Sequence, residues 1–129
     1  MVEGATSEDI VNLFMEYINA KDLDAATSLL SENCEYDNVP MGKVFGREVI
    51  YEYLLPVMER CSEIDWITTR QASLEGLVLN ERFDRFLWPH GWVEVPVAGI
   101  FEVVNGEITL WRDYFDLPTY TDQLPIPSD

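Results

Sequence analysis

Apolar residues recur at helical spacing in the first half of the chain and at every second position in most of the second half. The first helical pattern follows Ser7, which we expect to cap it, and is broken at Lys21-Asp22. Two further helical patterns follow, and we expect Pro56 to bend or end the last of them. The three apolar stripes are formed by Ile10, Leu13, Phe14, Tyr17 and Ile18; by Leu23, Ala26, Leu29 and Leu30; and by Val49, Ile50, Tyr53, Leu54 and Val57.

A short extended segment is predicted between the second and third helices, over residues 34–38, followed by a loop marked by Gly42 and Gly46. From about Glu63 the apolar period changes to two, which predicts four strands over residues 64–72, 77–88, 92–104 and 107–115. Hairpin turns are expected at residues 89–91 and at Asn105-Gly106, the second of type I′. Pro96 lies inside the third of these strands and predicts a bulge or an unmade ladder bond.

Helices followed by an antiparallel meander predict an α+β fold in which helices cover one face of a strongly curved sheet. With 129 residues, the chain has room for one domain over residues 1–129. We expect residues 1–6 and the proline-containing residues 118–129 to be peripheral tails. The concave side of such a sheet, closed by helices, is a typical place for a small-ligand pocket.

The charge of the chain narrows its range of partners. It has 24 acidic and 8 basic residues, a net charge of −16, which argues against nucleic acid or an anionic membrane surface as a partner. Cys34 and Cys61 stand in no metal-ligand spacing, and no segment has the pattern of a signal peptide or a membrane span. We therefore expect a cytoplasmic protein without a metal site.

Charged residues in two of the predicted strands are the most informative feature of the sequence. Alternation places Arg82 and Asp84 on one face of their strand, and Asp113 lies in another strand rich in aromatic residues. Burying an unpaired charge in an apolar core costs on the order of several kcal/mol or more, because the charge loses its hydration. If these three side chains face inward, they form a carboxylate–guanidinium–carboxylate cluster, in which one carboxyl becomes an acid and the other a base.

The pattern alone leaves other interpretations open, because both faces of each strand are mixed and a bulge would shift the alternation. Arg82–Asp84 is also typical of an exposed cross-strand ion pair, and Arg112-Asp113 of a solvated pair. Tyr36 and Asn38 stand where strand-end and turn residues are common. The single histidine, His90, falls in an expected hairpin turn, which argues against a Ser-His or Cys-His nucleophile.

Three motifs in this order and spacing resemble those of the limonene-1,2-epoxide hydrolases. The similarity extends over residues 7–117, and its motifs are Tyr36-Asp37-Asn38-Val39-Pro40, Asn80-Glu81-Arg82-Phe83-Asp84 and Trp111-Arg112-Asp113-Tyr114-Phe115-Asp116-Leu117. The family is part of the larger NTF2-like and SnoaL-like group. The resemblance therefore implies a cone-shaped fold, with a mixed but mainly antiparallel sheet covered by the N-terminal helices.

The resemblance also implies a role for each of five polar residues. Tyr36 and Asn38 would hold a water, Arg82 would bridge the two aspartates, Asp113 would be the base and Asp84 the acid. The implied reaction adds this water in one step to a neutral, apolar, terpene-like or cyclic epoxide and gives a vicinal diol, without a cofactor or metal. The apolar residues expected to line the pocket are Val57, Trp66, Phe86, Val97, Trp111 and Phe115.

Two other interpretations of the function remain open for the same fold. A ketosteroid isomerase-like or polyketide cyclase-like enzyme would not need an arginine that joins two aspartates. A non-catalytic ligand-binding protein of the NTF2-like group would tolerate the loss of any of the five polar residues, yet all are present. The resemblance further implies a homodimer, which an apolar outer sheet face would support; we expect that face to carry Leu77, Leu79, Phe83, Leu110 and Tyr114.

Overall fold

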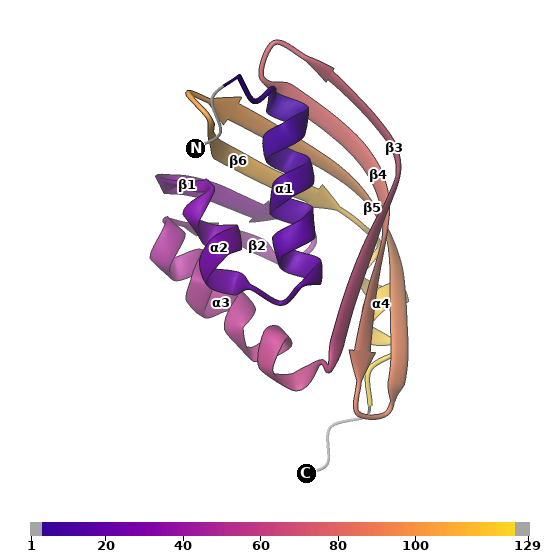
Figure 1. Ribbon diagram of the computed structural model, residues 1–129. Helices are drawn as coiled ribbons and strands as arrows, with labels where there is room; N and C mark the ends of the chain where they lie inside the picture. Colours follow the sequence, from indigo (N-terminus) through magenta and orange to yellow (C-terminus); the bar gives the residue numbers. More distant parts are fainter. Residues whose placement is uncertain (1–3, 126–129) are drawn as a thin grey trace.

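A computed structural model describes residues 4–125 as an α+β fold, in which three helices lie against one face of a curved six-stranded sheet (Figure 1). The strand order is β2-β1-β6-β5-β4-β3, and of these pairings only β1 with β6 is parallel. The predicted fold class is therefore confirmed. The elements are α1 (Ser7–Asn19), α2 (Leu23–Ser28), β1 (Leu30–Asn38), β2 (Gly42–Phe45), α3 (Arg47–Arg60), β3 (Glu63–Leu74), β4 (Leu77–Trp88), β5 (Gly91–Val104), β6 (Glu107–Tyr114) and α4 (Leu117–Thr121).

Tight turns join the long strands. Asn105 and Gly106 have φ values of 52° and 78°, the positive pair that a type I′ turn requires, so this predicted hairpin is confirmed. A second turn with positive φ at both positions, Glu75-Gly76, joins β3 to β4 and was not predicted. Pro96 forms no bulge: it pairs in register with Phe83, and it lies outside the part of β5 that pairs with β6.

The first half of the chain departs from the predicted elements in three places. The strand predicted at residue 34 begins at Leu30, which enters the sheet fully buried and pairs with β6. The loop predicted around Gly42 contains the short edge strand β2. Of the two effects predicted for Pro56, a bend or an end, the end is excluded: α3 continues to Arg60 and its last turn buries Met58 against the core.

The segment after β6 contains a short helix at the periphery of the fold. Residues 117–121 form α4, and Tyr120 of this helix packs against the core. Gln123 then ties the segment to β5, because its side chain donates to the carbonyl oxygen of Glu94 at 2.8 Å and accepts from the Glu94 amide at 3.0 Å. The rest of the expected tails, residues 1–3 and 126–129, lies outside the described residues.

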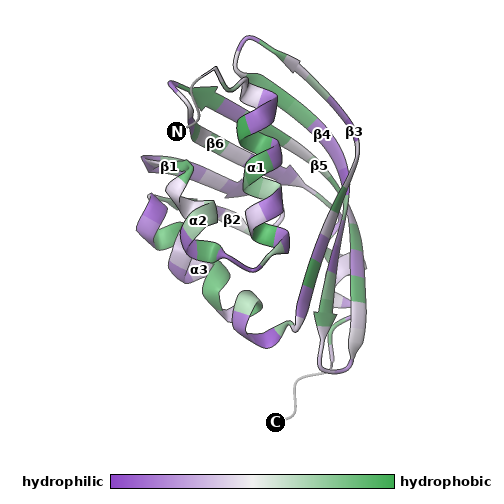
Figure 2. Cartoon of the chain, viewed as in Figure 1, coloured by the Kyte–Doolittle hydropathy of each residue, from purple (hydrophilic) through white to green (hydrophobic). Residues whose placement is uncertain are grey.

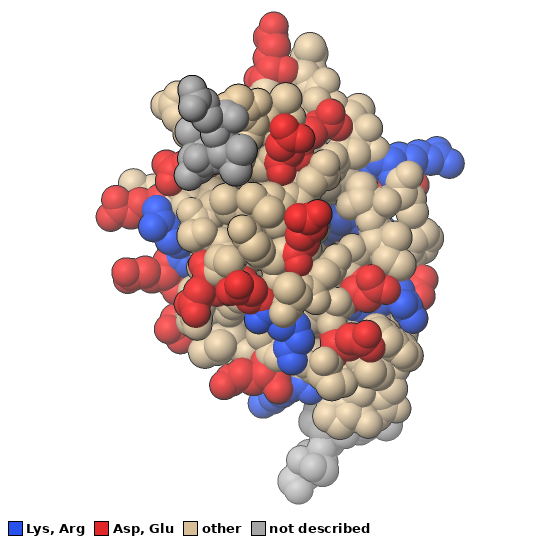
Figure 3. Space-filling model, viewed as in Figure 1, with Lys and Arg blue, Asp and Glu red and all other residues tan. Residues whose placement is uncertain are grey.

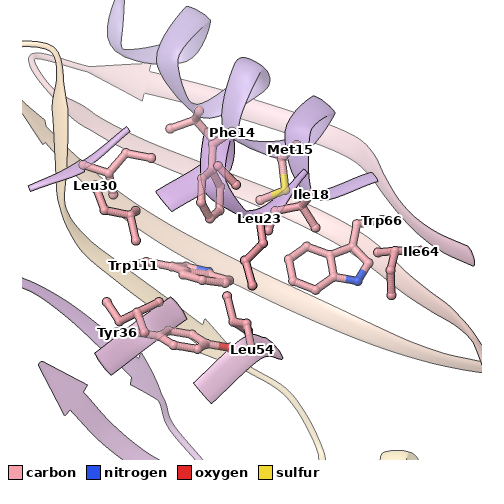
Figure 4. Close-up of a cluster of buried hydrophobic side chains, with 14 of the residues drawn as sticks. Phe14, Met15, Ile18, Leu23, Leu30, Tyr36, Leu54, Ile64, Trp66 and Trp111 are labelled. Atoms are coloured by element: carbon pink, nitrogen blue, oxygen red, sulfur yellow. The ribbon is translucent and has the colours of Figure 1, made fainter. Parts of the chain in front are cut away.

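Aromatic side chains form the centre of the core between the helices and the sheet (Figure 4). Trp111 of β6 is fully buried, with the ring of Phe14 edge-on at 5.0 Å on one side and the ring of Tyr36 stacked at 3.8 Å on the other. Hydropathy colouring shows apolar and polar residues alternating along α1, whose buried residues face the sheet (Figure 2). A capping box between Thr6 and Asp9 fixes the start of this helix.

Acidic side chains are scattered over the helical side of the surface rather than gathered in one patch (Figure 3). On the outer face of the sheet, Leu77, Leu79, Phe83 and Tyr114 are between 37% and 45% exposed, as predicted. Leu110, which was expected on this exposed face as well, is only 9% exposed and adds little to it. Within residues 4–125, no helix is long and apolar enough to cross a membrane.

Candidate active site

Arg82 is the centre of the site, and it is fully buried on the helix-covered face of β4. Its guanidinium group donates to Asp84 through Nε at 3.0 Å and Nη2 at 2.9 Å, and to Asp113 through Nη1 at 3.1 Å and Nη2 at 2.9 Å. Nη1 also donates to Oδ1 of Asn80 at 3.1 Å. These bonds use all five N–H donors of the arginine. The exposed ion pair that remained open for Arg82 and Asp84 is therefore excluded.

Burial controls the protonation of this cluster. It raises the pKa of Asp84, and Arg82 only partly opposes the shift. Burial also lowers the pKa of Arg82, but the two carboxylates more than reverse this effect, so the guanidinium stays charged. One cation in an apolar setting balances one carboxylate, and the second carboxyl tends to keep its proton. The raised pKa of Asp84 fits the acid role predicted for it.

Gly99 of β5 leaves the space that this cluster occupies. A Cβ atom at this position would clash with Nη1 of Arg82 and lie 2.7 Å from Oδ1 of Asn80 and 3.0 Å from Oδ1 of Asp113. None of these atoms is free to move, since each takes part in the hydrogen bonds around the guanidinium group. The glycine is thus required by close packing rather than by a turn.

We expect Gly99→Ala to lower kcat by about 10²-fold or more, the loss that follows when a catalytic group is misplaced by about 1 Å. The added methyl displaces the guanidinium group and both carboxylates that depend on it. Steady-state kinetics of purified variants measures the effect. Ala98→Ser adds one heavy atom at the neighbouring outward position and should retain activity. A fully active Gly99→Ala variant would contradict the rigid geometry described here.

Tyr36 and Asn38 reach the same cluster from β1. The parallel register places Asn38 directly beside Asp113 and Tyr36 beside Trp111. Burial raises the pKa of Tyr36 well above its ordinary value and Asp113 adds to the shift, so its hydroxyl keeps its proton. Among the residues that the structure describes, nothing donates to the buried Oδ1 of Asn38. This pair can therefore offer both a donor and an acceptor to a small polar molecule.

A cavity of about 300 Å³ adjoins these groups, and both Asp84 and Asp113 face it. Apart from the two carboxyl groups and a few amide and hydroxyl groups, its walls are apolar. Five of the predicted apolar residues line it: Val57, Trp66, Phe86, Val97 and Phe115. Trp111 does not line it, because Tyr36 stacks on its ring and covers it. The wall also includes Met41, Tyr53, Leu54, Met58, Val95 and Tyr120.

The sequence pattern could have predicted some of the additional residues that line the cavity. Leu54 and Met58 are four positions apart on one face of α3, and Val95 alternates with Val97 in β5. Nothing in the sequence indicated Tyr120, because its segment has no clear helical or strand periodicity. Its ring lies 5.7 Å from that of Phe86, and burial raises its pKa to about 12.

Arg112, the sequence neighbour of Asp113, faces the opposite side of the sheet. Its Nε donates to Asp37 at 2.8 Å and its Nη2 to Glu35 at 3.2 Å. The solvated Arg112-Asp113 pair that the sequence left open is therefore excluded, and the two arginines serve separate clusters. Over residues 4–125, no group of three or more His, Cys, Asp or Glu side chains is arranged to hold a metal ion.

Comparison with known proteins places this site in a family. The family model described as "Limonene-1,2-epoxide hydrolase catalytic domain" matches residues 5–125. The chain belongs to this family. It is also 31% identical over 107 residues to the epoxide hydrolase EphG of Mycobacterium tuberculosis, a match that covers 83% of this chain and 71% of that protein. Membership in the limonene-1,2-epoxide hydrolase family confirms the resemblance and supports an epoxide hydrolase.

Solved structures support the same grouping. An epoxide hydrolase of M. tuberculosis described as LEH-like superposes with a TM-score of 0.81 at 28% identity, covering 90% of this chain and 86% of that one. A Catenulispora acidiphila protein with a ketosteroid isomerase-like fold also reaches a TM-score of 0.81, at 20% identity and with 92% and 93% of the two chains covered. This second likeness shows the shared fold alone. The assignment to the family thus rests on the family model and the sequence relative and not on the fold alone.

Proposed function

We propose that this enzyme of the limonene-1,2-epoxide hydrolase family adds water in one step to a neutral, apolar, terpene-like or cyclic epoxide and releases a vicinal diol. The observation that carries the proposal is the pair of buried carboxyl groups, Asp84 and Asp113, which share one arginine and face one largely apolar cavity. Opening a strained three-membered ether needs an acid on the ring oxygen and a base on the attacking water. This cluster supplies both.

In the proposed reaction Asp113 is ionised and Asp84 is protonated at the start. A water held by Tyr36 and Asn38 gives a proton to Asp113 as its oxygen attacks a ring carbon, while Asp84 gives its proton to the ring oxygen as the C–O bond breaks. One water is consumed and both oxygens end as hydroxyl groups. The proton that Asp113 gained then returns to Asp84. Each acid or base contribution is typically worth ~10²–10⁴-fold in rate.

The walls of the cavity favour an uncharged substrate. Val57, Phe86 and Val97 present hydrocarbon or aromatic surface. Among the described residues that line the cavity, the acidic ones are the two aspartates bound to Arg82, and none is basic. An anionic substrate would have to lose its hydration next to these carboxylates, which is costly. A neutral ring or terpene-like skeleton instead gains from burial of its apolar surface.

We expect the purified protein to convert limonene oxide or cyclohexene oxide into a diol, with cyclohexene oxide giving the trans product. Gas chromatography against authentic diols measures the conversion, and a reaction without enzyme corrects for spontaneous hydrolysis. Conversion to a ketone or an allylic alcohol, or no conversion of either epoxide, would contradict the proposal. The isomerase and cyclase chemistries of the fold remain less suitable, because abstraction of a carbon-bound proton does not need an arginine between two aspartates.

We also expect a homodimer. Leu77, Leu79, Phe83 and Tyr114 form an exposed apolar face on the outer side of the sheet, and such a face seldom stays exposed in a monomer. Sedimentation at micromolar concentration should give a species of about twice the 14.9 kDa chain mass. Phe83→Lys should shift it toward the monomer, whereas Val104→Lys, in an exposed position at the end of β5, should not. A wild-type species of single-chain mass would contradict the dimer.

A further inference from the structure

We infer that Asn80 is a positioning residue that fixes Arg82, and through it the two aspartates of the proposed reaction. This inference rests on the proposed function. Asn80 is 6% exposed, and its Oδ1 accepts the one Nη1 hydrogen that neither aspartate takes, at 3.1 Å. A guanidinium group without this acceptor would keep a buried, unsatisfied N–H. Asn80 lies in one of the motifs that carry the family resemblance, but the resemblance assigned it no role.

A bulge in β3 selects the neighbour of Asn80. Thr68 pairs with Arg82, and Arg70 then pairs with Glu81, so Thr69 is the extra residue. As a result Gln71, and not Arg70, lies beside Asn80 on the inner face. Arg70 points to solvent with 86% of its side chain exposed. Without the bulge, a second cation would lie next to Arg82 and compete for the same carboxylates.

The amide of Asn80 has a single orientation, because its two ends have different partners. Arg82 only donates, so it must face Oδ1, and Nδ2 of Asn80 donates to Oε1 of Gln71 at 3.2 Å. Gln71 in turn donates through Nε2 to Oδ1 of Asn12 on α1 at 2.9 Å. A chain of neutral amides therefore runs from the first helix to the guanidinium group and reaches it at Nη1, the nitrogen that also donates to Asp113.

We also infer that the side chain at position 80 must be neutral. An aspartate at position 80 could accept the same hydrogen bond, but it would add a third negative charge around one arginine. Additional negative charge favours protonation of the neighbouring carboxyl groups. The proposed reaction needs one ionised and one neutral carboxyl at neutral pH. A neutral acceptor at position 80 completes the hydrogen bonds of Arg82 and leaves one carboxyl ionised and the other neutral.

Two substitutions of Asn80 test its role as a hydrogen-bond acceptor and its neutrality separately. Asn80→Ala removes the acceptor and should lower kcat by about 10-fold to 10²-fold while KM changes less than about 3-fold, because substrate contacts are not altered. Asn80→Asp keeps the acceptor and should shift both limbs of the kcat profile to higher pH, by on the order of one unit. Asn105→Asp makes the same chemical change in the exposed β5–β6 turn and should leave the profile in place.

A titration without substrate tests the inference separately from the proposed function. Carboxyl carbon NMR of ¹³C-labelled aspartate follows the Asp84–Asp113 pair directly, and Asn80→Asp should move its titration to higher pH even if the epoxide assay fails. An unmoved titration in Asn80→Asp would overturn the inference. So would an Asn80→Ala variant that melts at a lower temperature but keeps the wild-type kcat, because Asn80 would then be only structural. Absence of any wild-type epoxide turnover, with the titration shifted as expected, would contradict the proposed reaction alone.

Discussion

Replacing either Asp84 or Asp113 with asparagine should remove most of the activity, with kcat reduced by ~10²–10⁴-fold or more. An amide keeps the size and shape of the carboxyl group, but it can serve neither as a carboxylic acid nor as a carboxylate base. Both variants should still unfold cooperatively, at a melting temperature near or above that of the wild type. The reason is that the one carboxyl group left in each variant can still ionise and balance the buried arginine, so that no buried charge is left unpaired.

The control for these variants is Asp65→Asn. Asp65 also pairs with an arginine on a neighbouring strand, since Arg85 donates to it at 2.9 Å, but it is far more exposed and does not line the cavity. Steady-state kinetics and thermal unfolding of the three variants would show whether loss of activity follows the cavity carboxyls only. Near-wild-type turnover in Asp84→Asn or Asp113→Asn would refute the roles assigned to them.

The strand pattern was sufficient to predict which of the charged side chains share a face of the sheet. Alternation along residues 77–88 separates Arg82 and Asp84 from Phe83, and the structure has this separation: Arg82 is fully buried and Phe83 is 38% exposed. Which of the two faces is concave did not follow from the pattern, because both faces contain apolar residues. The motif resemblance supplied that choice, and the hydrogen bonds of Arg82 agree with it.

Irregular positions limited the prediction elsewhere. The bulges at Thr69 and Thr109 each insert one residue into a strand, and no local residue preference announces them. The first decides that Gln71 contacts Asn80, which is why this contact could not be foreseen. Tyr120 was missed for a different reason: α4 has only 5 residues, and its position depends on tertiary contacts such as those of Gln123.

The source of the new oxygen in the diol gives the sharpest test of the mechanism. We expect it to come directly from water, with no ester between the substrate and either aspartate. Each carboxylate oxygen of Asp84 and Asp113 already accepts a hydrogen bond from Arg82, at 2.9–3.1 Å, which makes these oxygens poor nucleophiles. An ester would also need a base for its hydrolysis. The single histidine, His90, lies in the β4–β5 turn with Nε2 2.8 Å from the carbonyl oxygen of Gln123, and it does not line the cavity.

A single turnover in heavy-oxygen water, with enzyme in excess over epoxide, separates the two mechanisms. Direct attack puts the label into essentially every diol molecule formed in the first turnover, and the protein stays unlabelled. An ester mechanism instead transfers an unlabelled carboxylate oxygen to the first diol, and its hydrolysis leaves the heavy oxygen on the aspartate. Mass spectrometry of the diol and of peptides containing Asp84 or Asp113 reads both outcomes from one sample. Unlabelled diol together with a labelled aspartate would exclude the one-step attack. In a one-step attack the new oxygen of the diol comes from water and never from the protein.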